Sequence, residues 1–355
     1  MNLSEHLTFA LRKLENIQER AATLEAKVED NYIGIDRIYK SSIKLFSDSN
    51  KNLYDTFYSL YKRDTETPSE AKRRYHNRFS EATGILRLCQ LQEIYLLKKL
   101  DELALRLNID YSIAYGSLLG FARAGKTIPW DDDCDINIQF DDIITLAERI
   151  REFDDYKDFE ICCQTNLPRF RPTGFSGVID LFPMVQMKSM KEYAANISFL
   201  NRLKDLDLFR ENKRTDPASF LKDAKLKLFK NMTYIDSADL DENDEPVLVK
   251  SVVLFGKKNS PHKPSPIKHI YPTYRGNYDG IEVNIPNDPE ALLAQYYNNF
   301  WVVPTTRKRP HNTSANTKKI IEFCDFIKEH DYEFYENRII PVLNEYLEVS
   351  GNGTK

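Results

Sequence analysis

Three aspartates at alternate positions are the residues of this chain whose type and spacing most clearly predict chemistry. They lie in the segment WDDDCDINI, residues 130–138. If this segment is a strand, Asp131, Asp133 and Asp135 share one face with Asn137, because side chains alternate between faces. Like charges at that spacing repel one another by about 1 kcal/mol or more when partly desolvated. Divalent cations such as Mg²⁺ bind through carboxylate oxygens, so the pattern predicts a metal site, with a solvated acidic loop as the alternative.

A glycine–serine pair lies upstream of the aspartates. Gly116 and Ser117 end a predicted strand and begin a predicted helix. A helix N-terminus offers unpaired backbone N–H groups and the positive end of the helix dipole, which suit a phosphate. Gly116 lets the backbone approach a ligand, and the Ser117 hydroxyl can donate to a phosphate oxygen. An ordinary strand–helix turn with a serine N-cap is the alternative.

Another carboxylate, Asp180, lies within the apolar run GVIDLFP, which is a predicted strand. Aspartate is depleted in strands and is rarely buried without a partner. Beside Asp133 and Asp135 it would complete a two-metal site, in which the metals clamp the attacking and leaving oxygens of a phosphoryl transfer. We therefore assign metal binding and catalysis to Asp133, Asp135 and Asp180, with Mg²⁺ or Mn²⁺ as the cofactor.

The spacing of apolar residues predicts the elements that position these groups. The chain contains both helix and strand patterns, and the expected fold class is α+β. Helices are expected over residues 76–108, 188–232, 290–300 and 315–347, with a further one starting at SLLGFARAG and ending at Gly125. Strands are expected at YSIAYG, DDDCDINIQF, EICCQT and GVIDLFPMVQM, and loops with short strands over 256–289.

Residues 1–48 are predicted to form one long helix with apolar residues in a heptad register, interrupted by Asn31 and Ser42. Sustained heptad spacing is typical of a coiled coil, which would make the chain a homo-oligomer. A long helix packed on its own domain is the alternative, and Gly34 favours it. The predicted organisation is therefore this helix, a helical connector over 49–85, a catalytic domain over 86–348 and a disordered tail over 349–355.

Composition excludes several classes of protein. The 355 residues carry a formal net charge of −4, which gives no overall attraction to nucleic acid. The five cysteines, an odd number without a CxxC pair, fit neither a disulfide framework nor a zinc ribbon. The charged N-terminus does not resemble a signal peptide, and no run approaches 18 apolar residues. We expect a cytoplasmic protein, with any membrane contact peripheral and at the inner face.

The segment GSLLGFARAGKTIPWDDDCDI resembles the signature of the LicD family, the phosphocholine transferases of lipopolysaccharide and teichoic acid. The same motif occurs in the fukutin group, whose members transfer ribitol phosphate. The resemblance extends over about residues 90–312, where GSLLG, IPWDDDxD and IDLFP follow in the family's order. It implies a nucleotidyltransferase-like mixed sheet with flanking helices, a CDP-activated donor and a glycan acceptor. By position, the family's metal-binding pair becomes Asp133 and Asp135, and its third carboxylate becomes Asp180.

The resemblance also implies substrate-binding residues. The family's later basic, histidine-containing element corresponds here to residues 307–311. Arg123 either reaches the donor phosphates or forms a salt bridge to the acidic segment. The family often has histidine where Ala124 follows that arginine, and an aliphatic residue where Cys134 stands. The predicted substrate-binding set is Gly116, Ser117, Arg123, Asp131, Arg309 and His311.

The leading hypothesis is transfer of phosphocholine, glycerol phosphate or ribitol phosphate from a CDP-linked donor to a hydroxyl of lipopolysaccharide, capsule or teichoic acid. One alternative keeps the site but transfers a nucleotidyl group and releases pyrophosphate. Another belongs to a different class, an oligomeric scaffold or membrane-recruitment protein whose catalytic domain is vestigial.

Overall fold

The computed structural model describes residues 52–163, 167–202, 216–250, 264–297, 299–303 and 317–351. The chain divides into two compact units, residues 1–62 and 63–355. In the first unit the described part is a helix over residues 52–61, where the rings of Phe57 and Tyr61 stack with centroids 5.4 Å apart. The helix expected over residues 1–48, with its coiled coil, lies outside the described residues.

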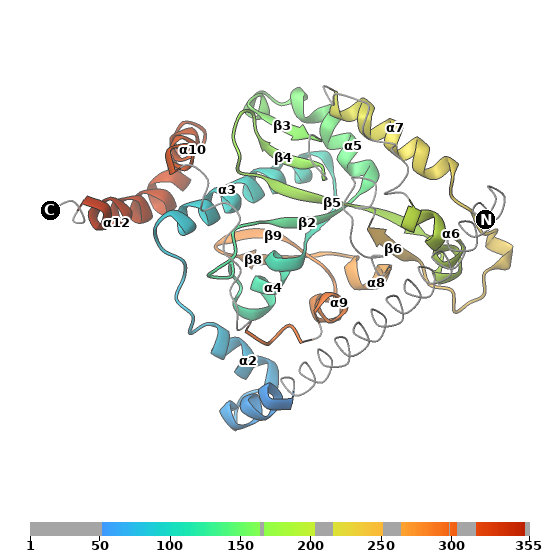
Figure 1. Ribbon diagram of the computed structural model, residues 1–355, viewed down its shortest axis with the longest axis horizontal. Helices are drawn as coiled ribbons and strands as arrows, with labels where there is room; N and C mark the ends of the chain where they lie inside the picture. Colours follow the sequence, from blue (N-terminus) through green and yellow to red (C-terminus); the bar gives the residue numbers. More distant parts are fainter. Residues whose placement is uncertain are drawn as a thin grey trace, which may run out of the picture. The chain divides into compact units, whose positions relative to one another are not determined.

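A mixed sheet forms the centre of the second unit, and its main path is β1-β2-β5-β4-β3 (Figure 1). Only β2 and β5 are parallel among the described pairs, and β6 extends the sheet by pairing with both β5 and β7. A separate hairpin, β8–β9, accompanies it. The α+β class, with a mixed sheet and flanking helices, is therefore confirmed. The strands are β1 (Tyr111–Ile113), β2 (Asp135–Gln139), β3 (Phe159–Cys162), β4 (Arg169–Pro172), β5 (Ile179–Met187), β6 (Val247–Lys250), β7 (Ser265–Pro266), β8 (Tyr274–Tyr278) and β9 (Ile281–Ile285).

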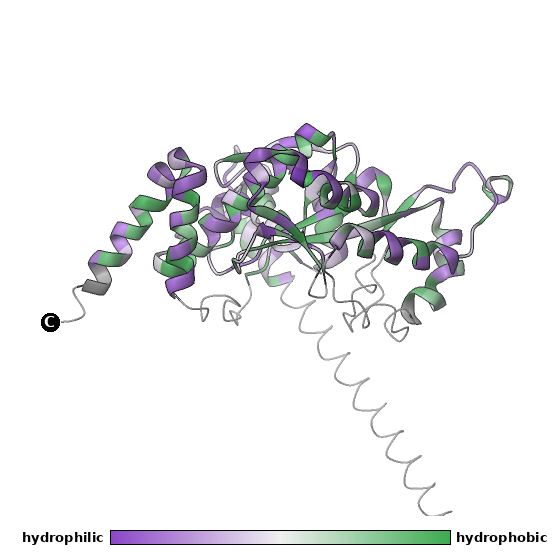
Figure 2. Cartoon of the chain, turned by 90° about the horizontal axis from the view of Figure 1, so that it is seen from above, coloured by the Kyte–Doolittle hydropathy of each residue, from purple (hydrophilic) through white to green (hydrophobic). Residues whose placement is uncertain are grey.

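Apolar residues explain why β2 and β5 lie at the centre of the sheet. Ile136 and Ile138 of β2 are buried, as are Leu181 and Met184 of β5. Figure 2, coloured by hydropathy, shows both hydrophobic and hydrophilic residues in the strands of the sheet. Strands buried on both faces are expected to be near-continuous apolar runs, so the polar residues that interrupt them need a separate explanation.

The helices begin and end at residues suited to these positions. Thr67 and Glu70 form a capping box at the start of α2. Proline follows the N-cap aspartate of both α7 and α9, where its missing N–H is not needed. The helices are α2 (Pro68–His76), α3 (Gly84–Leu107), α4 (Tyr115–Ala124), α5 (Phe140–Arg149), α6 (Met190–Arg202), α7 (Pro217–Lys230), α8 (Ile267–Ile270), α9 (Pro289–Tyr296), α10 (Thr317–His330), α11 (Tyr332–Phe334) and α12 (Ile340–Gly351), with short 3₁₀ turns η1 (Ile150–Glu152), η2 (Asp154–Tyr156) and η3 (Ser237–Asp239) and a π-helical turn η5 (Tyr335–Ile339).

The long helix α3 ties the sheet to its surroundings. It packs against β4, β5, β9, α10 and α12, whereas α5 packs across β2, β3 and β5 and carries α7 on it. Arg87 of α3 donates two hydrogen bonds to Asp279, at the turn of the β8–β9 hairpin, over 3.0 and 2.9 Å. Asp279 also accepts from Arg338 and from the backbone N–H of Thr127. This buried network fixes the loop that leads from α4 to the acidic segment.

Several predicted elements differ from the structure. The strand expected over residues 130–138 begins only at Asp135. In place of a single helix over 188–232 there are α6 and α7, and α7 has its own N-cap at Asp216. The helix expected over 315–347 is interrupted after His330, because the Asp331 side chain accepts from the N–H of Phe334 and starts a new turn. The helix expected over 76–108 begins at Gly84, and α12 runs to residue 351, beyond the predicted start of the tail.

Candidate active site

Two of the predicted metal ligands are neighbours across the sheet. Asp135 is the first residue of β2, and its Cα pairs directly with that of Asp180 on the parallel strand β5. Neighbouring strands lie about 4.8 Å apart, and directly paired residues present their side chains on one face. The two aspartates therefore lie side by side on one face of the sheet, although they are 45 residues apart in sequence.

The other two aspartates reach the site from an irregular segment. Asp131 and Asp133 precede β2, so strand alternation does not account for their direction, and the sequence argument was wrong on that point. Gln90 of α3 holds the segment, because its amide donates to the backbone carbonyls of Ile128 and Asp131 over 3.1 and 2.8 Å. Tertiary hydrogen bonds, and not a strand, bring these carboxylates together.

The glycine–serine pair at the start of α4 contacts the acidic segment. Helix α4 begins at Tyr115 with Ala114 as its N-cap, so Ser117 is not a capping residue. Ser117 is buried, and its hydroxyl accepts from the backbone N–H of Asp135 over 3.2 Å. A Cβ on Gly116 would lie less than 3.0 Å from an Asp131 carboxylate oxygen. Glycine is thus required here because the Asp131 carboxylate lies against the helix backbone.

A cavity of about 390 Å³ opens over these residues. Its acidic part is formed by Asp131, Asp133 and Asp135. Asp180 does not line it, and its Oδ1 instead accepts from Arg169 Nε of β4 over 2.6 Å. The rest of the lining includes Gly116, Arg123 and the aromatic side chains Tyr115, Trp130, Tyr297 and Phe300.

Tyr115 is held in an uncommon backbone conformation at the edge of the cavity. Its φ of 42° lies in the left-handed region, which a non-glycine residue occupies only when its surroundings enforce it. Its ring packs between those of Phe182 and Tyr296, with centroids 4.7 and 4.8 Å away. These contacts fix an aromatic side chain next to Asp135.

Crowded carboxylates give the site unusual electrostatics. Burial, together with the charge of Asp133, raises the pKa of Asp131 to about 8. Glu93 of α3 is also buried here, and burial followed by repulsion from the aspartates raises its pKa well above the ordinary value. Sequence analysis missed Glu93, whose only signal was a carboxylate on the apolar face of a helix. Burial and the neighbouring carboxylates thus disfavour the ionised forms of both groups, and a bound cation would relieve the repulsion among them.

The remaining predicted binding residues have different outcomes. Arg123 is buried, and its Nε and Nη2 donate to the backbone carbonyls of Phe300 and Val302, both over 2.8 Å. These contacts hold the turn that forms one wall of the cavity. Neither predicted alternative, a donor phosphate or an aspartate, accounts for them. Arg309 and His311 lie outside the described residues.

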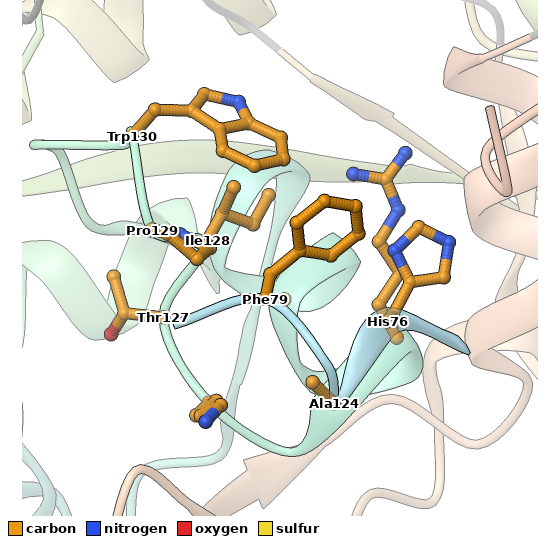
Figure 3. A pocket seen from close by; sticks show the side chains of 10 residues that line it. His76, Phe79, Ala124, Thr127, Ile128, Pro129 and Trp130 are labelled. Atoms are coloured by element: carbon orange, nitrogen blue, oxygen red, sulfur yellow. The ribbon is translucent and has the colours of Figure 1, made fainter. Parts of the chain in front are cut away.

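A smaller hollow adjoins the cavity behind Trp130 (Figure 3). The rings of Trp130 and Phe79 meet edge to face with centroids 5.9 Å apart. His76 Nε2 lies 3.1 Å from the carbonyl oxygen of Trp301, and burial, then the charge of Arg123, lowers the pKa of His76 to about 4. His76 is therefore a neutral structural residue that donates to this carbonyl and supports the wall of the cavity.

The residues of the site fit a divalent cation, judged by their chemistry. Within the described ranges, no group of three or more His, Cys, Asp or Glu side chains is arranged as a ready metal cage. Mg²⁺ needs only one or two carboxylates when substrate phosphates complete its shell. Burial and then the charge of Asp133 raise the pKa of Asp131, and a cation at this position would oppose both effects. Asp133 and Asp135 at the cavity, with Asp180 beside them, are the oxygen ligands that such an ion would use.

The comparison with protein families bears on the part of the chain that carries the acidic segment. Residues 108–166 match the family model described as LicD/FKTN/FKRP, nucleotidyltransferase domain. The resemblance seen in the sequence is thereby confirmed over these residues, and a domain of this family implies a LicD-type phosphotransferase. Nucleotidyltransferase-like domains typically use a divalent metal. Asp180 and Arg169 lie beyond the matched stretch, so their assignment rests on geometry alone.

One curated protein is similar to part of the chain. It is named Uncharacterized protein RP689, from Rickettsia prowazekii (strain Madrid E), and is 37% identical over 82 residues. The similarity covers 21% of this chain and 31% of that protein, so the chain matches less than a third of its relative's length. Within the described residues, no helix is long and apolar enough to span a membrane.

Proposed function

We propose that the protein transfers a phospho-alcohol group from a CDP-activated donor to a hydroxyl of a cell-surface glycan. Phosphocholine, glycerol phosphate and ribitol phosphate are the candidate groups, and lipopolysaccharide, capsule and teichoic acid are the candidate acceptors. The observation that carries the proposal is the direct pairing of Asp135 with Asp180 beside a cavity that Asp133 also lines. The family match over residues 108–166 supports the reaction class.

In this reaction the acceptor oxygen forms a bond to the phosphorus of the alcohol phosphate, and the bond from that phosphorus to an oxygen of CMP breaks. The electron pair leaves with CMP, and the hydroxyl proton passes to a carboxylate that lines the cavity. A bound Mg²⁺ or Mn²⁺, held by Asp133, Asp135 and Asp180, would supply charge stabilisation for the phosphoryl oxygens. Positioning and electrostatics account for most of the catalysis of such transfers. The aromatic side chains of the cavity exclude water and provide surfaces for a nucleobase or sugar.

The experiment is incubation with a panel of CDP-linked alcohols, Mg²⁺ and acceptor glycans, with CMP release measured. Asp133→Asn and Asp135→Asn should each reduce turnover at least about 100-fold, because a charged ligand is lost at nearly constant volume. Asp141→Asn is the matched control, since that aspartate is exposed and ion-paired with Lys225 outside the cavity. Turnover near the wild-type rate in either site variant refutes the assignment. Release of pyrophosphate from a nucleoside triphosphate instead of CMP identifies nucleotidyl transfer.

A further inference from the structure

A row of three charged side chains crosses the sheet next to the cavity. Asp135 of β2 pairs with Asp180 of β5, and Asp180 pairs in turn with Arg169 of β4. Directly paired residues on neighbouring strands share a face of the sheet. The row is therefore carboxylate, carboxylate, guanidinium, and Arg169 lies one strand beyond the predicted metal ligands.

Arg169 uses only part of its hydrogen-bonding capacity within the described residues. Its Nε donates to Asp180 Oδ1 over 2.6 Å, and this is the single hydrogen bond that its side chain makes there. The side chain is 31% exposed. A guanidinium has five N–H groups in a planar fork, and within the described ranges neither terminal nitrogen of Arg169 makes a hydrogen bond. The carboxylate of Asp180 fixes the direction of that fork.

Arg171, a neighbouring arginine on the same strand, uses more of its guanidinium than Arg169 does. Arg171, two residues along β4, donates through Nε to Glu160 Oε1 over 2.9 Å, and its Nη2 lies 2.9 Å from the same oxygen. Its partner is on β3, the strand farther from the acidic residues. Arg171 therefore engages two of its nitrogens in an ion pair remote from the cavity, whereas Arg169 engages one nitrogen beside the site.

We propose that Arg169 binds the phosphate oxygens of the donor, with Asp180 holding its guanidinium in place. This proposal rests on the proposed function and adds a residue to it. The planar fork of arginine suits two phosphate oxygens at once. It is fixed on a strand, so its charge is already in position when negative charge spreads over the phosphoryl oxygens and the leaving CMP. Arg123, the arginine of the cavity, already donates to two backbone carbonyls.

The test compares the binding of CMP and of cytidine by calorimetry, with and without Mg²⁺, in wild type, Arg169→Ala, Arg169→Lys and Arg171→Ala. Arg169→Ala should weaken CMP binding about tenfold and leave cytidine binding unchanged, because only CMP carries a phosphate. Its turnover should fall about 100-fold or more, as for other arginines that stabilise phosphoryl transfer. Arg169→Lys should recover part of both losses, and Arg171→Ala should bind and turn over like wild type.

The outcomes separate this proposal from the one on which it rests. Equal CMP affinity in wild type and Arg169→Ala overturns the role of Arg169 and leaves the proposed function intact. Parallel losses for CMP and cytidine also overturn it, because they indicate a structural role only. A wild-type protein that binds neither compound refutes the CDP-linked donor, and the role of Arg169 falls with it. Arg169→Gln, which retains the length of the side chain, replaces the alanine variant if the latter does not fold.

Discussion

Two glycines of α4 give a sharp test of how the acidic site is built. Gly116 and Gly120 are one helical turn apart, and each lacks room for a side chain. A Cβ at 116 would press on a carboxylate oxygen of Asp131, with Asp131 Cγ at 3.4 Å and Asp133 Oδ1 at 3.8 Å. A Cβ at 120 would press on the backbone carbonyl of Lys126, with the Ile128 nitrogen at 3.3 Å. The atom that a Cβ at 116 would meet belongs to the Asp131 side chain, whereas the atom that a Cβ at 120 would meet belongs to the backbone.

The two substitutions to alanine should therefore separate activity from stability. In Gly116→Ala the Asp131 side chain must rotate away until the contact exceeds 3.0 Å, which disturbs the coupled Asp131 and Asp133 carboxylates. Displacements approaching 1 Å in a catalytic site reduce rates by up to about 100-fold, and little of the core is affected. In Gly120→Ala the backbone itself must move, and such overpacking costs about 1–3 kcal/mol.

The assay pairs a thermal-unfolding measurement with CMP-release turnover for each variant. Gly116→Ala should lose about 10- to 100-fold in turnover while its Tm stays within about 2 °C of wild type. Gly120→Ala should lose several degrees of Tm and retain more turnover per folded molecule. Wild-type turnover in Gly116→Ala would refute the claim that Asp131 packs against this helix. A loss of Tm equal to that of Gly120→Ala would show that the site and the fold are not separable here.

Three further predictions concern the supports and the charge of the site. Without metal, the stability contributed by Asp131 is full below about pH 4 and is lost as pH rises toward 8, because its folded-state pKa is raised to about 8. The affinity for Mn²⁺, measured by calorimetry, should therefore rise between pH 6 and 8. This rise should be smaller in Asp131→Asn. Gln90→Met should lower the free energy of unfolding by about 1–3 kcal/mol and also reduce turnover, because two backbone carbonyls of the acidic segment lose their donor. Unchanged turnover in a folded variant would contradict the role of Gln90 in holding this segment. Asp279→Asn should destabilise the protein by about 3–5 kcal/mol in urea unfolding, because Arg87 and Arg338 lose their shared carboxylate; a difference below 1 kcal/mol would count against the network.

Local patterns were sufficient to predict the strands that carry the carboxylates. The apolar alternation of residues 136 and 138 and the run around Asp180 gave β2 and β5, and the glycine at 125 gave the end of α4. Strand β4 was missed because RFRP alternates charge with an aromatic residue and ends in proline, which is unusual inside a sheet. β4 forms because it pairs with β3 and β5, and this pairing depends on tertiary structure that the local sequence does not show.

The site could be predicted only in part, for the same reason. The types and order of Asp133, Asp135 and Asp180 indicated a shared site, but nothing local shows that Asp135 and Asp180 pair in register. Gln90 and Glu93 lie on a helix whose pattern indicates a core element. Their roles appear only when α3 is placed against the acidic segment. Ser117 was predicted to donate to a phosphate, with an N-cap as the alternative; it is not the N-cap, and its hydroxyl accepts from the backbone N–H of Asp135.

The electrostatics of the site argue for a ligand more strongly than the motif does. A fold that brings Asp131, Asp133, Asp135 and Glu93 together disfavours the ionised forms of Asp131 and Glu93, because burial and the neighbouring carboxylates raise the pKa of both. Among the described side chains, the cation in the row across the sheet is Arg169, which is bound to Asp180. Local conflicts of this kind are expected where function opposes stability. A divalent ion and an anionic substrate together would resolve the conflict, because the ion neutralises the carboxylates and the phosphates complete its coordination. The aspartates and the arginine therefore form one row of opposite charges, which a divalent ion and an anionic substrate would complete.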